Sequence, residues 1–313
     1  IMTISIFFVL IFATAQAGGF GAVMENAKAL PGFLSFSQTY TGSGAAPYGP
    51  LTVISTLAWG LGYFGMPHIL LRFMAIEDEK KLKVSRRVGS VWVVIAMGLA
   101  IFIGFVGNAL SAQGAVETLE GSASETIIIR IADLLSTHGI LPALMAGLIL
   151  AGILACTMST ADSQLLAASS AFASDVYKPL IRKDASDKEM LWAGRIVVAA
   201  IAIVALIIAS NPNSGTIMGL VENAWGVFGA AFGPVILLSL FWKRFTFAGA
   251  VAGIVVGAAV DGLWLAFLSG TGIYEIIPAF AASMIAAIVA SLLSKKPDEA
   301  VEALFDKAVN YEE

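Results

Sequence analysis

Residues 59–68 read Trp59-Gly60-Leu61-Gly62-Tyr63-Phe64-Gly65-Met66-Pro67-His68 and lie within an apolar stretch of the chain. Glycine and proline both weaken a helix, since glycine is flexible and proline lacks a backbone donor. Transporters place discontinuous helices at the substrate site, where freed backbone groups coordinate a ligand or an ion. Trp59, Tyr63 and Pro67 are spaced to share one face of a helix. The stretch predicts either a solute pocket lined by these three residues or a proline-kinked helix with ordinary aromatic packing.

The composition around this stretch is that of a membrane protein. Apolar residues make up 58% of the chain and charged residues 13%, and the mean hydropathy is +0.87. Soluble domains carry roughly 25% charged residues, so this chain has too few charged residues to cover the surface of a water-soluble domain. The net charge is −4 without a basic face, which excludes a nucleic-acid partner. One cysteine, Cys156, cannot form an intrachain disulfide or a multi-cysteine metal cluster.

The hydropathy pattern predicts an all-α polytopic membrane protein with eight transmembrane helices. An apolar stretch this long must be helical, because lipid offers no partner for backbone polar groups. The fourth span is too long for a simple crossing, so we expect it to bend or project beyond the bilayer. Residues 124–135, between the third and fourth spans, are amphipathic and predict a short helix outside the bilayer. The expected spans are 1–23, 51–74, 88–111, 140–174, 191–210, 216–242, 246–268 and 273–294.

The N-terminal run has two readings. Residues 13–17, Ala-Thr-Ala-Gln-Ala, resemble a signal-peptide cleavage site, but the usual basic segment before the apolar run is absent. We therefore expect a transmembrane helix and a chain that starts within a longer protein.

Lysine and arginine gather in alternate connections. Loops 75–87 and 175–190, the turn at 243–244 and the start of the tail at 295 are basic, whereas the intervening connections hold at most one such residue each. Strict alternation of eight helices puts every basic connection on one side, and the positive-inside rule makes that side cytoplasmic. We expect a membrane domain over 1–294 and a cytoplasmic tail over 295–313, weakly amphipathic and solvated, in a cytoplasmic (inner) membrane.

A second polar cluster interrupts the fourth expected span. Residues 157–163 read Thr-Met-Ser-Thr-Ala-Asp-Ser, and hydroxyls in membrane helices commonly serve only as interhelical hydrogen-bond donors. Sodium is a hard cation that prefers oxygen ligands. Ser159 and Thr160 offer hydroxyls, and the carbonyl of Cys156 lies one turn earlier. Asp162 is an intramembrane carboxylate and a further candidate. We expect a sodium site here.

The remaining motifs predict packing rather than chemistry. Gly249, Gly253 and Gly257 form a small-xxx-small pattern, which indicates close helix contact within the chain or in a homodimer. The sequence has no phosphate-binding loop, no nucleophile elbow and no paired metal ligands, so we do not expect an enzyme.

Several long motifs together resemble the sodium:solute symporter family, in particular its bacterial sodium/proline members. The resemblance follows the order of the chain and covers most of it, and it implies a five-plus-five inverted-repeat fold of which the N-terminal helices are absent here. The motifs are WGLGYFGMPHILLRFMA (59–75), LACTMSTADSQLL (154–166) followed by DVYK (175–178), VENAWGVFGAAFGPVILLSLFWKR (221–244) and YEIIP (274–278).

The resemblance also implies residue roles. Trp59, Tyr63 and Pro67 match positions that line the solute site, and Ser159 and Thr160 match sodium-ligating hydroxyls. Cys156 matches a position that gives sodium a backbone carbonyl. The other sodium ligands belong to a helix absent from this chain.

The implied function is therefore sodium-coupled symport of a small solute in a lipid bilayer, with L-proline the first candidate. Met66 stands where proline carriers have glutamine, which leaves pantothenate, another amino acid or a short carboxylate open. A symporter-like sensor module and a non-transporting fragment are the alternatives of other classes.

Overall fold

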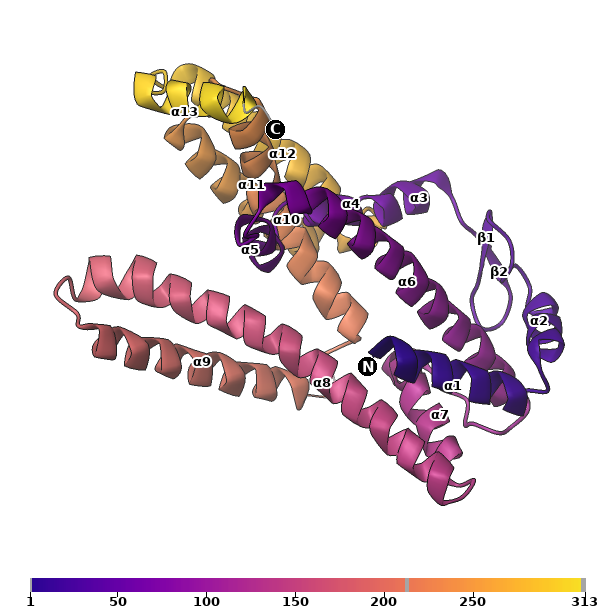
Figure 1. Cartoon of the computed structure of the whole chain (residues 1–313). Coiled ribbons are helices and arrows are strands. Elements are labelled where there is room, and N and C mark those ends of the chain that lie inside the picture. The colour runs from indigo at the N-terminus through magenta and orange to yellow at the C-terminus, as the bar shows by residue number, and fades with distance from the viewer. Residues whose placement is uncertain (1, 212–213, 311–313) are drawn as a thin grey trace. The chain divides into compact units, whose positions relative to one another are not determined.

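The structure is a computed structural model that describes residues 2–211 and 214–310 of the chain. It divides into two compact units, which are described separately (Figure 1). Unit 1 comprises Ile1–Ser35, Tyr40–Ala45 and Val84–Ile217, and unit 2 comprises Phe36–Thr39, Ala46–Lys83 and Met218–Glu313.

Six helices among the described residues are long and apolar enough to cross a membrane. Each of the six overlaps one span expected from hydropathy, although the ends differ by several residues. The fourth expected span is one long helical stretch, because α8 continues without interruption into a π-helical segment, Phe172–Ile181. The helices are α6 (Leu82–Ala112), α8 (Ile140–Ala171), α9 (Asp187–Ala209), α10 (Ile217–Phe241), α11 (Phe247–Phe267) and α12 (Ile276–Leu293).

The first two expected spans are not single helices. Over 1–23 the structure has α1 (Met2–Gln16) and α2 (Phe20–Ala29), which are bent by 78° at the break. Gly18 and Gly19 both have positive φ there, a conformation that ends a helix and that other residues rarely adopt. Over 51–74 the chain forms three short helices, α3 (Pro50–Leu57), α4 (Trp59–Gly62) and α5 (Pro67–Met74). Hydropathy detects apolar length but not these interruptions.

The chain also departs from an all-α fold in one connection. Strands β1 (Gln38–Tyr40) and β2 (Ala45–Pro47) form a two-stranded sheet. Gly42, with φ of 85°, lies in the turn between them. Period-2 alternation over three residues is too short to be read from a sequence, so the sheet was not expected.

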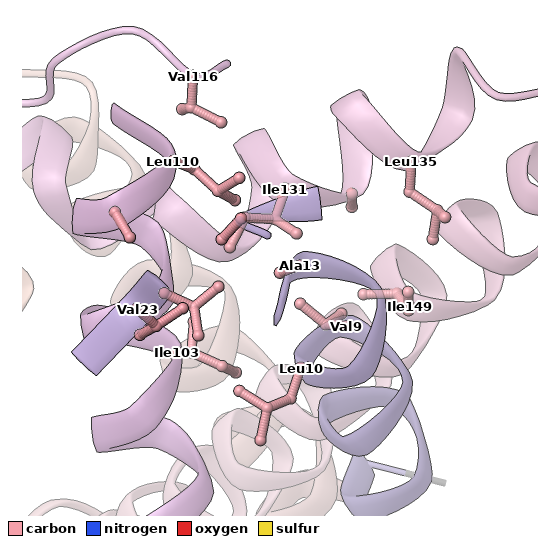
Figure 2. Packing of buried hydrophobic residues seen from close by; sticks show 14 of the residues in the cluster. Val9, Leu10, Ala13, Val23, Ile103, Leu110, Val116, Ile131, Leu135 and Ile149 are labelled. Atoms are coloured by element: carbon pink, nitrogen blue, oxygen red, sulfur yellow. The ribbon is translucent and has the colours of Figure 1, made fainter. Parts of the chain in front are cut away.

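Large aliphatic side chains form the core of unit 1 (Figure 2). They come from α1, α2, α6, α8 and α7 (Ile127–Ser136), the last being the amphipathic helix expected outside the bilayer. Ile131 and Leu135 lie one turn apart on α7 and are both buried, so its apolar stripe faces this core. Val9, Leu110 and Ile149 are fully buried in the same cluster.

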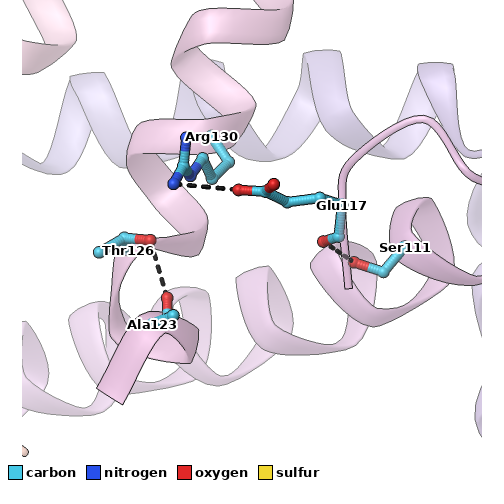
Figure 3. A network of polar contacts seen from close by, with 5 residues as sticks. All are labelled: Ser111, Glu117, Ala123, Thr126 and Arg130. Atoms are coloured by element: carbon cyan, nitrogen blue, oxygen red, sulfur yellow. Dashed lines mark hydrogen bonds and ion pairs between the residues drawn. The ribbon is translucent and has the colours of Figure 1, made fainter. Parts of the chain in front are cut away.

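Polar contacts order the connection that leads into α7 (Figure 3). Arg130 pairs with Glu117 at 3.0 Å, and the Ser111 hydroxyl donates to the Glu117 carbonyl at 3.2 Å. The Thr126 hydroxyl donates to the Ala123 carbonyl at 2.7 Å, within the 3₁₀ turn Gly121–Thr126 that precedes α7. Both members of the ion pair are about half exposed, so the pair fixes the course of the loop more than it stabilises the fold.

Small residues let α10, α11 and α12 approach closely in unit 2. The glycine stripe of α11 is buried within the chain, as the packing alternative predicted. A Cβ added at Gly253 would stand 3.1 Å from the Ala287 Cβ, and one added at Gly257 would meet the backbone of Ala230. The Ser283 hydroxyl donates to the Gly253 carbonyl at 2.9 Å and ties α12 to α11 where both are buried.

Part of the tail forms an exposed helix. The helix α13 (Glu299–Val309) follows α12 after a short linker. Lys243 donates to the Asp306 carboxylate at 2.6 Å and lies 3.7 Å from Glu302. The hydrogen bond to Asp306 raises the pKa of Lys243. The basic turn between α10 and α11 therefore holds the acidic face of α13.

Gly65 and Gly60 form a matched pair for testing the packing of the broken span. A Cβ at Gly65 would meet the backbone carbonyl of Phe228 on α10, whereas a Cβ at Gly60 would meet nothing within 4 Å. We expect Gly65→Ala to destabilise the protein by about 1–3 kcal/mol through overpacking. Gly60→Ala should be neutral or slightly stabilising, since alanine favours helix. The measurement is the thermal unfolding midpoint of each purified variant in detergent. Equal midpoints for the two variants would contradict the packing.

Candidate functional site

The second expected span is interrupted between Gly62 and Pro67. Helix α4 ends at Gly62, the chain turns through Tyr63, Phe64 and Gly65, and α5 begins at Pro67. Met66, just before α5, has extended backbone, as expected of the residue before a proline. Pro67 at the first position of α5 loses no hydrogen bond, because the N–H there would be unpaired in any helix. The discontinuous helix predicted from the glycines and the proline is therefore present.

This break changes how the three candidate solute residues are related. A shared face for Trp59, Tyr63 and Pro67 requires a continuous helix, and the structure interrupts the helix between the second and third of them. Trp59 begins α4, Tyr63 caps its end, and Pro67 begins α5. Tyr63 remains 55% exposed, so its ring and hydroxyl are accessible in unit 2.

Aromatic rings from α10 and from the start of α12 gather around these residues. The Trp225 ring lies 5.3 Å from the Tyr63 ring, edge to face, and 6.4 Å from the Trp59 ring. The Tyr274 ring lies 5.9 Å from the Trp59 ring. Its hydroxyl donates to the Glu222 carbonyl at 2.8 Å, which fixes the ring against α10. The site is thus an aromatic cluster built from three separate parts of unit 2.

Trp225 and Tyr274 received no role from the sequence. Both lie in motifs that carried the family resemblance, VENAWG and YEIIP, but spacing along a single helix cannot show which distant residues face one another. The signal that could have identified Trp225 and Tyr274 was the presence of an aromatic residue inside each of these two motifs.

The glycines near the break serve a different purpose from close approach to a ligand. A Cβ at Gly62 would meet the Trp225 indole, and a Cβ at Gly65 would meet the Phe228 carbonyl. Conversely, a Cβ at Gly229 of α10 would stand 2.6 Å from the Gly62 Cα. Gly62 and Gly65 therefore admit α10. Only Gly60, with open space around it, could admit a ligand.

The candidate sodium ligands lie on α8 in unit 1. The Thr160 hydroxyl donates to the Cys156 carbonyl at 3.3 Å, so these two oxygens lie together, as the one-turn spacing predicted. Ser159 is exposed one residue before Thr160, and Asp162 is exposed half a turn further on. The Ser163 hydroxyl donates to the Ser159 carbonyl at 3.0 Å. The oxygens form a polar strip along one part of α8.

The neighbouring hollow in unit 1 is apolar. It has a volume of about 180 Å³ and is bounded by α1, α7 and α8. Ile6, Ile128 and Ile149 dominate its lining, with Cys156 and Thr157 at one end. Among the described residues, no group of three His, Cys, Asp or Glu could hold a metal ion. An ion on α8 would depend on hydroxyl and carbonyl oxygens.

The solute candidates and the sodium candidates belong to different units. Trp59 and Tyr63 lie in the aromatic cluster of unit 2, while Pro67 only begins α5. Cys156, Ser159 and Thr160 lie on the polar strip of α8. Their roles remain predictions.

Comparison with known proteins identifies the class to which this arrangement belongs. The model of the sodium:solute symporter family matches residues 1–257. The chain belongs to the sodium:solute symporter family.

Individual relatives agree with this membership. The chain is 46% identical over 256 residues to the high-affinity proline transporter PutP of Bacillus subtilis, covering 82% of this chain and 52% of that protein. It is 44% identical over 309 residues to the sodium/proline symporter of Haemophilus influenzae, covering 97% of this chain and 58% of that protein. The chain thus spans a little over half the length of these relatives.

A solved structure shares the fold. The chain matches a Na⁺-coupled sialic acid symporter in a substrate-bound, outward-open state with a TM-score of 0.68. The match covers 95% of this chain and 61% of that one, at 19% sequence identity. At this identity the likeness concerns the fold alone.

Proposed function

We propose that the protein containing this chain is a sodium-coupled symporter of a small solute, with L-proline as the solute. The family membership and the two proline-transporting relatives support the reaction, and the aromatic cluster at the break supports the solute. Proline has an apolar ring and a charged amine and carboxylate. Aromatic rings can cover the former, and freed backbone groups with the Tyr63 hydroxyl can meet the latter.

We assign the solute contacts to Trp59, Tyr63 and Pro67. The observation that supports this most directly is the packing of Trp59 and Tyr63 around Trp225 at a helix break. Rigid aromatic side chains give contact area at a small entropic cost. Trp225 supports the two rings from behind, because its indole also packs on Gly62.

We assign the coupling ion to α8. The carbonyl of Cys156 and the hydroxyls of Ser159 and Thr160 offer hard oxygen ligands on consecutive turns. We include Asp162 as a further candidate ligand to the ion. The remaining ligands would come from other parts of the transporter.

We place the protein in the cytoplasmic membrane with eight crossings of this chain, counting the two interrupted stretches as spans within an inverted-repeat fold. The basic connections would then face the cytoplasm, together with α13 and the tail.

The sodium assignment is tested by Thr160→Ala. Loss of a ligand to a charged group is worth roughly 1.5–3 kcal/mol, so apparent sodium affinity should fall about ten- to hundredfold. Thr157→Ala is the matched control, because the Thr157 hydroxyl also donates to the carbonyl four residues earlier, at 3.0 Å. The measurement is the sodium dependence of proline uptake in proteoliposomes. Uptake that persists when choline replaces sodium would refute the coupling.

The solute assignment is tested by Tyr63→Phe, which removes only the exposed hydroxyl. Proline affinity should fall at least tenfold while sodium affinity changes little, because that hydroxyl meets the charged end of the solute. Trp264→Phe is the control, since the Trp264 indole donates to the Ile273 carbonyl at 3.3 Å and serves packing. Similar small losses of proline affinity in both variants would assign Tyr63 to packing. Sodium-driven uptake of labelled pantothenate or acetate, with no sodium-driven uptake of labelled proline, would identify another solute.

The orientation is tested with single cysteines in a Cys156→Ala background. Lys80 and Ser269 are both exposed and lie in connections assigned to opposite sides. We expect a membrane-impermeant maleimide to label Ser269→Cys on intact cells and Lys80→Cys only after permeabilisation. Labelling of position 80 on intact cells would show that this connection faces outward and that the assigned orientation is wrong.

A further inference from the structure

Two carboxyl groups are buried together in unit 2, beside the aromatic cluster: Glu275 follows Tyr274, and both groups lie at Gly226, the residue after Trp225. Asp261 of α11 has no exposed surface, and Glu275, immediately before α12, is 7% exposed. Both oxygens of Asp261 and the Oε1 atom of Glu275 are buried without a hydrogen-bond partner. Neither residue belongs to an ion pair among the described residues.

The two groups converge on one glycine of α10. A Cβ at Gly226 would stand 3.0 Å from the Asp261 Oδ1 and 3.1 Å from the Glu275 Oε1. The absence of a side chain at Gly226 therefore makes room for both carboxyl groups. Their elements also pack tightly here, because Gly257 on α11 faces the backbone of Ala230 on α10.

Among the described residues, the charged groups that act on the pair are acidic. The other titratable groups that face the pair are Glu222 of α10 and Tyr274, the residue before Glu275. The Tyr274 hydroxyl is committed to the Glu222 carbonyl. The carboxyl group of Glu222, if ionised, would add a third negative charge.

We propose that Asp261 and Glu275 form a proton-binding site that holds one proton at neutral pH, with Asp261 as its carrier. Two ionised carboxylates this close, out of water and without a counter-ion, repel each other and lose their hydration. Binding one proton from water converts a carboxylate to a carboxylic acid and removes one charge. Three oxygens without further ligands suit a proton better than sodium, since hard metal cations take about six oxygen ligands.

Position decides which member carries the proton. Glu275 occupies the N-cap position of α12, an 18-residue helix whose dipole favours an anion there, and its side chain makes no capping hydrogen bond. Asp261 lies within the span α11, where the charged form has no such support. The acid O–H of Asp261 can then turn toward the Glu275 carboxylate and give both groups a partner.

Infrared difference spectroscopy of the full transporter in lipid tests this site. Between neutral and alkaline pH, the protein should lose the carbonyl-stretch band of a buried carboxylic acid. Asp261→Asn, which keeps size and removes the acid, should abolish that band. Glu275→Gln should retain the band at a shifted frequency, because the partner of the acid changes. Asp187→Asn, at an exposed carboxylate, is the control and should leave the band unaltered.

The outcomes distinguish this site from the alternatives. A band that survives Asp261→Asn, or no band in the unmodified protein, would overturn the proposal. A band that is absent in sodium buffer and appears only after sodium is removed would identify a sodium site instead. Since the readout is spectroscopic, it is independent of which solute is transported and of whether transport is sodium-coupled.

Discussion

The close backbone contact between the broken span and α10 is the constraint on which the arrangement of unit 2 depends. A helix interrupted at membrane depth leaves backbone N–H and C=O groups unpaired, which is tolerated only where protein or a water-filled cavity covers them. Gly62 and Gly65 allow α10 to cover the break, and Gly229 of α10 leaves room for the Gly62 backbone. The same contact brings the Trp225 indole against Tyr63, so one packing requirement positions the aromatic cluster.

The sequence was informative where a physical signal is local. Apolar length identified the membrane class and the regions of all six continuous spans, and the amphipathic stripe identified α7. Glycine and proline together indicated an interruption within 59–68, which the structure places between Gly62 and Pro67. One-turn spacing correctly placed the Cys156 carbonyl beside the Thr160 hydroxyl.

The sequence was uninformative where structure depends on distant partners. A break after Gln16 rests on two glycines with positive φ, and glycines in membrane helices more often serve packing. Gly62 and Gly65 face α10 rather than a ligand, which no single-helix pattern can show. Asp261 was overlooked for the same reason: its significance comes from Glu275, fourteen residues later and on another element. Helical periodicity relates residues on one helix, whereas sites form between helices.

The helices of the two units pack through different kinds of side chain. This difference explains why the buried carboxyl groups lie in unit 2. Unit 1 buries aliphatic side chains against the amphipathic helix α7, much as a soluble domain does. In the same unit, α9 buries none of its residues. Unit 2 instead packs glycine, alanine and serine between helices, the usual mode where lipid removes the hydrophobic drive for association. Backbones at such close range exclude water around Gly226 and Gly257. A carboxyl group there has only its neighbours to satisfy it, so the proposed proton between Asp261 and Glu275 would give each carboxyl group a partner.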